Sequence, residues 1–150
     1  MTSEVTMNLQ IAKPATSRIA RVATGSARVL LGLLFFVSGF NGLFHVLPEP
    51  SAQLPAGAAA FAGALMATGY MFPLIMGTQL IVGSLLLVNR FVPLALTLLA
   101  PFMVNSIAFH VFLEPTGRPM AFIVLALQLF LVWRYRRAYA VLLSSRAAQA

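Results

Sequence analysis

Seven polar side chains lie within or at the edges of apolar stretches of this sequence, and these residues could do chemistry. They are Asn41, His45, Gln79, Asn105, His110, Glu114 and Gln128. Because His110 and Glu114 are four positions apart, they share one face of a helix, where the carboxylate could orient the imidazole. Imidazole titrates near neutral pH, so the two histidines could exchange protons with a quinone-type head group or ligate a haem or a metal.

A metal or haem site has little support in the sequence. Two histidines and one carboxylate lack the spacing of the usual ligand sets. The chain has no cysteine, which excludes a cysteine-ligated iron–sulfur cluster, covalent haem attachment and a thiol nucleophile. Ser38 has no base on its own turn to activate it. We therefore predict no metal site, disfavour haem, keep a quinone as the cofactor class to consider, and assign no catalytic residue.

The composition indicates a membrane protein. Apolar residues make up 60% of the chain and charged residues 9%, compared with about 25% charged residues in soluble domains. The net charge of +7 does not indicate nucleic-acid binding, because the basic residues lie at the ends of apolar runs, where the positive-inside rule places them. We therefore expect the lipid bilayer, and no nucleic acid, as a partner.

The apolar runs predict an all-α polytopic membrane protein, a four-transmembrane-helix bundle. The segment 56–69 is too short to cross a membrane and is predicted to be a short interfacial helix between spans 1 and 2. A cleaved signal peptide is the competing interpretation of the N-terminus, but the first apolar run is longer than the usual signal sequence. The predicted organisation is a flexible cytoplasmic segment at 1–26, spans at about 27–47, 70–88, 91–113 and 119–139, and a cytoplasmic tail at 140–150.

The distribution of basic residues predicts the orientation of these spans. In a four-span arrangement, every Lys and Arg except Arg118 lies on the same side of the membrane. The positive-inside rule then places both termini in the cytoplasm, and we expect a multi-pass protein of the cell inner membrane. The basic residues on that side are Lys13, Arg18, Arg21, Arg28, Arg90, Arg134, Arg136, Arg137 and Arg146.

The depths of the polar residues suggest a site. At about 1.5 Å per residue, they occupy the midplane and the outer half of the membrane. Polar groups at such depths usually face a bundle interior or a wet cavity, so we hypothesise an outward-facing polar pocket. Its candidate residues are Asn41, His45, Gln79, Asn105, His110 and Glu114, with Gln128 as a further candidate. The alternative is that the amides hold helices together. Asn105 and His110 are about 140° apart around a helix and do not share a face.

The sequence resembles the DoxX-like membrane proteins, most specifically in two parts. One is the SGFNGLF segment of the first span, and the other contains Pro101, Asn105, Phe109, His110, Phe112 and Pro115. The resemblance covers roughly residues 27–137 and implies a four-helix membrane bundle. The family name comes from subunits linked to thiosulfate:quinone oxidoreduction and quinol oxidase complexes, although most relatives have no assigned activity. In that family the second span often carries Glu where this chain has Gln79, so a buried acid is missing here.

Two functions are consistent with these features. The first is a redox-associated membrane subunit that binds a quinone-like or small amphipathic ligand in the polar pocket. If the protein is an enzyme, it would be a membrane oxidoreductase subunit, working with a redox protein complex or as a homo-oligomer. The alternative is a non-enzymatic membrane scaffold or small-solute permease, in which the intramembrane polar residues serve packing or line a pathway.

Overall fold

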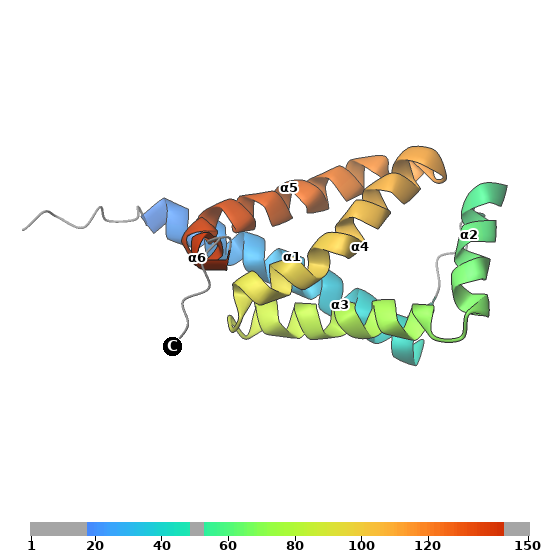
Figure 1. The fold of residues 1–150 in the computed structure, drawn as a ribbon, viewed down its shortest axis with the longest axis horizontal. Coiled ribbons are helices and arrows are strands. Elements are labelled where there is room, and N and C mark those ends of the chain that lie inside the picture. Colours follow the sequence, from blue (N-terminus) through green and yellow to red (C-terminus); the bar gives the residue numbers. More distant parts are fainter. Residues whose placement is uncertain (1–17, 49–52, 143–150) are drawn as a thin grey trace, which may run out of the picture.

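The computed structural model describes residues 18–48 and 53–142, and all regular structure in this part of the chain is helical. The four longest helices run between the two ends of a bundle, and two shorter α-helices lie near opposite ends of it (Figure 1). This arrangement confirms the predicted all-α fold. The elements are α1 (Arg18–Phe44), α2 (Ala56–Ala67), α3 (Met71–Leu87), α4 (Val92–Phe112), η1 (Pro115–Gly117), α5 (Arg118–Arg134) and α6 (Arg136–Leu142).

The helix lengths fit a membrane bundle. α1, α4 and the Pro115–Arg134 stretch are each long and apolar enough to cross a membrane. α2 and α3 pass the same test only as a pair, and they are bent by 92° at the break between them. The bend follows from local chemistry, because Gly69 adopts a φ of +74° and the Thr68 hydroxyl accepts a hydrogen bond from the Met71 N–H at 3.1 Å. α2 is therefore the predicted short helix between the first two spans.

Glycines bring α1 and α3 into direct backbone contact. A Cβ atom at Gly39 would lie 2.6 Å from the Met76 carbonyl oxygen, and one at Gly83 would lie 2.8 Å from the Gly32 carbonyl oxygen. Neither site has room for a side chain. Small residues allow this close approach in membranes, where dispersion contacts rather than water exclusion hold helices together.

The core lies where α1, α3, α4 and α5 meet. Leu31, Leu86, Leu99 and Leu131 are fully buried there. At one end of this core the Arg28 guanidinium donates to the carbonyls of the last turn of α3, including that of Leu87 at 3.3 Å. A cation at a helix C-terminus is favoured by both the free carbonyls and the helix dipole.

Two helix boundaries differ from the predicted spans. α1 begins at Arg18 rather than near Ala27, so residues 18–26 are helical and not a flexible segment. The final span ends at Arg134, where Tyr135 leaves the helical conformation, and α6 follows. The Tyr139 hydroxyl donates to the Pro93 carbonyl at 2.8 Å and thereby ties α6 to α4. Residues 1–17 and 143–150 of the predicted tails lie outside the described residues.

Candidate functional site

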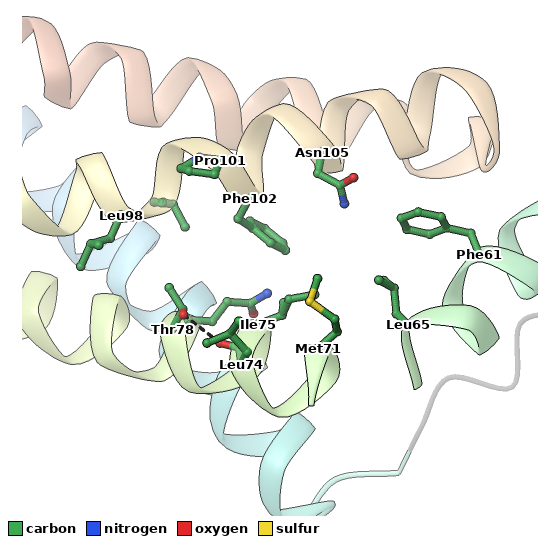
Figure 2. A pocket seen from close by; sticks show the side chains of 12 residues that line it. Phe61, Leu65, Met71, Leu74, Ile75, Thr78, Leu98, Pro101, Phe102 and Asn105 are labelled. Carbon is green, nitrogen blue, oxygen red and sulfur yellow. Dashed lines mark hydrogen bonds between the residues drawn. The ribbon is translucent and has the colours of Figure 1, made fainter. Parts of the chain in front are cut away.

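A cavity of about 300 Å³ lies between α2, α3 and α4, and we call it the main cavity. In Figure 2, Phe102 and Asn105 point from α4 toward Met71 and Ile75 of α3, while Phe61 and Leu65 of α2 close one side. The wall is almost entirely apolar. Its amide side chains are Gln79 and Asn105, which come from different helices.

Gln79 is a buried polar group of this cavity with an unpaired acceptor atom. Its side chain is only 2% exposed, and its Oε1 atom has no hydrogen-bond partner within the described part of the chain. An unsatisfied buried acceptor costs about 1–3 kcal/mol, and native proteins contain few of them. The Gln79 carbonyl therefore lacks a hydrogen-bond donor within the described residues.

A second cavity, of about 170 Å³, lies among α1, α3, α4 and α5, and we call it the inner cavity. Its polar wall is formed by Ser38, Gln79, Ser106 and His110. Gln79 and Phe102 line both cavities, so these two side chains form the partition between them.

The predicted contact between His110 and Glu114 is present. The His110 Nδ1 atom lies 2.9 Å from Glu114 Oε2 and 3.1 Å from the Glu114 carbonyl oxygen. The Glu114 carboxylate also accepts backbone hydrogen bonds from Thr116 at 3.1 Å and from Gly117 at 2.8 Å. These interactions with Thr116 and Gly117 lower the pKa of Glu114, so the carboxylate is ionised at neutral pH.

Two further residues complete this end of α4. A Cβ atom at Gly117 would lie 2.5 Å from His110 Nδ1 and 2.7 Å from Glu114 Oε2, so only glycine leaves room for the pair. Arg118 donates from Nε to the His110 carbonyl at 3.0 Å and from Nη2 to the Val111 carbonyl at 2.6 Å. These bonds satisfy free carbonyls at the C-terminus of α4 and fix the turn into α5.

Three of the predicted site residues lie apart from both cavities. Asn41 ends α1, because its Oδ1 accepts from the Leu47 N–H at 2.6 Å and its carbonyl accepts from the His45 N–H at 2.8 Å. His45 follows in the left-handed conformation, with an exposed side chain. Gln128 donates from Nε2 to the Leu96 carbonyl at 3.0 Å, which joins α5 to α4.

The seven candidate residues therefore do not line one common pocket. Gln79 and Asn105 both line the main cavity, and Gln79 and His110 both line the inner cavity. Glu114 lines neither cavity but is hydrogen-bonded to His110. No group of three or more metal-ligating side chains occurs within residues 18–48 and 53–142.

Sequence reasoning missed three residues that shape these cavities. Ser106 lies one turn before His110, and this spacing could have identified it. Phe102 and Phe61 gave no signal, because an aromatic residue in an apolar helix is indistinguishable from a core or lipid-facing residue.

A model of one protein family, DoxX, matches residues 23–112. The match covers more than half of the chain. This protein belongs to the DoxX family. The DoxX match begins within α1 and ends at the last residue of α4, so it includes Gln79, Asn105 and His110 but not Glu114. No curated protein and no solved structure matches this DoxX chain.

Proposed function

We propose that this DoxX-family membrane protein binds a small amphipathic ligand of the quinone or quinol type in the main cavity. The observation that carries the proposal is the unsatisfied Oε1 of Gln79, buried in an otherwise apolar wall. A buried polar atom without a partner is costly, and a hydroxyl group of a bound ligand would remove that cost. The volume of about 300 Å³ is at the lower end of the range for small-molecule pockets.

The chemistry of the wall suits a quinone-type ring. Such a ring has apolar faces and two oxygens at its edge. Phe61 and Phe102 offer aromatic surfaces to the ring faces. The Gln79 carbonyl can accept a hydrogen bond from a quinol hydroxyl, and the amide of Asn105 can donate one to a carbonyl oxygen. An apolar pocket with a few convergent polar groups is the usual form of a small-molecule site.

A role as a redox-associated subunit follows from such a ligand. Quinones carry electrons and protons within membranes, and the side chains of this cavity can bind and orient a ring but cannot accept electrons. Electron transfer would therefore require a second protein, so we propose that the chain works within a redox complex of the cell inner membrane. The resemblance to quinone-linked DoxX subunits supports the same role.

The arrangement of charges supports a cytoplasmic location for both termini. The start of α1, the turn between α3 and α4, and α6 lie at the same end of the bundle (Figure 1). That end carries Arg18, Arg90 and Arg136, while Arg118 lies at the other end.

Because the chain has no native cysteine, single-cysteine variants can test the orientation. An impermeant maleimide should label Thr116→Cys in intact cells and Ala140→Cys only after lysis; the reverse pattern would contradict the orientation.

A cavity-filling variant tests the ligand site. Ile75 lines the main cavity, whereas Ile81 on the same helix is 57% exposed on the outer surface of the bundle. In nanodiscs, Ile75→Trp should weaken binding of a short-chain ubiquinone at least about tenfold, equivalent to about 1.4 kcal/mol. Ile81→Trp is the matched control and should bind like the wild type. Equal binding by both variants would exclude the main cavity as the site.

The contacts of Asn41 and Gln128 favour the second candidate, a scaffold or small-solute permease. Both side chains make the structural hydrogen bonds described above, so some of the intramembrane polar groups do serve packing. The Oε1 atoms of Gln79 and Gln128 are both unpaired among the described residues, but only Gln128 also bonds a neighbouring helix, through its Nε2. The binding test separates the two functions, because a scaffold binds no quinone in either variant or in the wild type.

A further inference from the structure

We propose that the inner cavity is a proton path from the hydroxyl group of a ligand in the main cavity to His110, with Glu114 as the residue that positions the imidazole. This inference rests on the proposed function, because the ligand supplies the proton. It assigns to His110, Ser38 and Ser106 a role that ligand binding alone does not require.

The hydrogen bonds of His110 fix its tautomer. Both polar atoms near Nδ1 are oxygens of Glu114, one from the carboxylate at 2.9 Å and one from the backbone carbonyl at 3.1 Å. Because both oxygens are acceptors, Nδ1 carries the hydrogen and Nε2 keeps its lone pair. The Nδ1 and Cε1 atoms lie close to Gly117, and His110 lines the inner cavity. The proposed path ends at this unprotonated Nε2 atom.

The two cavities are joined at one polar residue. Gln79 lines both, so a ligand hydroxyl bonded to its carbonyl would lie at the partition between the main and inner cavities. Ser38 and Ser106 line the inner cavity together with Gln79 and His110. A volume of about 170 Å³ accommodates several water molecules, each of which occupies about 30 Å³ in the liquid. The polar side chains supply the partners that buried water needs.

The proton transfer from the ligand hydroxyl to His110 needs no further reactant. The O–H bond of the ligand breaks, protons move along the water chain, and an N–H bond forms at His110 Nε2. The negative charge stays on the ligand oxygen, and the new imidazolium lies against the Glu114 carboxylate. The charged groups that contact His110 within the described residues are Glu114, at the imidazole, and Arg118, at the backbone carbonyl. Glu114 lies beside the imidazole ring, whereas Arg118 bonds to backbone carbonyls of α4.

A coloured phenol can report this transfer. 4-Nitrophenol resembles one half of a quinol, and its absorption spectrum distinguishes the phenol from the phenolate. Bound to the wild-type protein in nanodiscs, it should ionise at a pH about one unit lower than when bound to His110→Gln. Gln retains a donor for Glu114 but cannot accept a proton. Empty nanodiscs give the background from the lipid.

A second variant tests the path itself. Ser106→Val replaces a hydroxyl of the inner cavity with an apolar group and should raise the ionisation pH of bound 4-nitrophenol toward that of His110→Gln. The matched control is Ser84→Val on α3, where the hydroxyl donates to the Leu80 carbonyl and lines neither cavity; it should behave like the wild type. If both serine variants ionise the probe as the wild type does, the path is wrong although the ligand site stands. If the wild type binds no probe, the proposed function fails and this inference fails with it.

Discussion

Replacing Gly83 with alanine should destabilise the bundle, although alanine normally stabilises a helix. The added Cβ would lie 2.6 Å from the Cα of Phe36 and 2.8 Å from the carbonyl oxygen of Gly32, both on α1. These are backbone atoms, which cannot rotate away, so the strain should reach the upper end of the usual 1–3 kcal/mol for overpacking. The gain in helix propensity offsets about 1 kcal/mol of it. The expected net loss in the free energy of unfolding is about 2 kcal/mol.

Gly77 provides the matched control on the same helix. No atom lies within 4 Å of the position of a Cβ there, so Gly77→Ala should gain about 0.5–1 kcal/mol from helix propensity alone. Unfolding in mixed micelles with increasing SDS, followed by the fluorescence of the single residue Trp133, gives both values. If the two variants have equal stability, α1 and α3 are not in the close contact described here.

Other substitutions separate structural from functional polar groups. Gln128→Leu should lower the free energy of unfolding by about 0.5–1 kcal/mol in the same SDS assay, because its hydrogen bond between helices is lost. Gln79→Leu should have a free energy of unfolding equal to or higher than that of the wild type, and it should abolish quinone binding. A marked loss of stability would contradict the functional role of Gln79. The hydrogen bonds of Glu114 lower its pKa below the ordinary 4.5, so its stabilising effect is complete above that pH and is lost as the pH falls through the lower folded-state pKa. The difference in melting temperature between wild type and Glu114→Gln should therefore narrow below pH 4.5, and a constant difference would contradict the assignment. Gly117→Ala should separate Glu114 from His110, seen as a shift of the His110 imidazole nitrogen resonances; unchanged resonances would refute the close packing.

The general fold could be predicted from the sequence because hydropathy and helix length are both constrained by the thickness of the membrane. The position of α2 followed from the same constraint, since 12 residues cannot cross the bilayer. The start of α1 could not be predicted this way. Hydropathy indicates where a helix enters lipid, whereas a helix begins where its hydrogen bonds begin. No proline lies between Pro14 and Pro48, so nothing prevents α1 from beginning before its apolar part.

The candidate site was only partly predictable, because sequence position gives the depth of a residue but not the rotation of its helix. The contact between His110 and Glu114 followed from their spacing of four within the chain. The different directions of Asn105 and His110 also followed from their spacing, and they line different cavities. The capping role of Asn41 was missed, since nothing in the apolar pattern indicated that α1 ends at Phe44.

The most direct measurement of the central claim is a photo-cross-linking map. A quinone carrying a photoreactive azide would be bound to the protein in nanodiscs, illuminated and located by peptide mass analysis. Ligand binding in the main cavity predicts labels on cavity residues of α2, α3 and α4, such as Phe61, Leu74 and Phe102, which excess unlabelled quinone suppresses. Labels confined to lipid-facing residues outside the cavity, such as Val29 and Ile123, and insensitive to competition would contradict the claim.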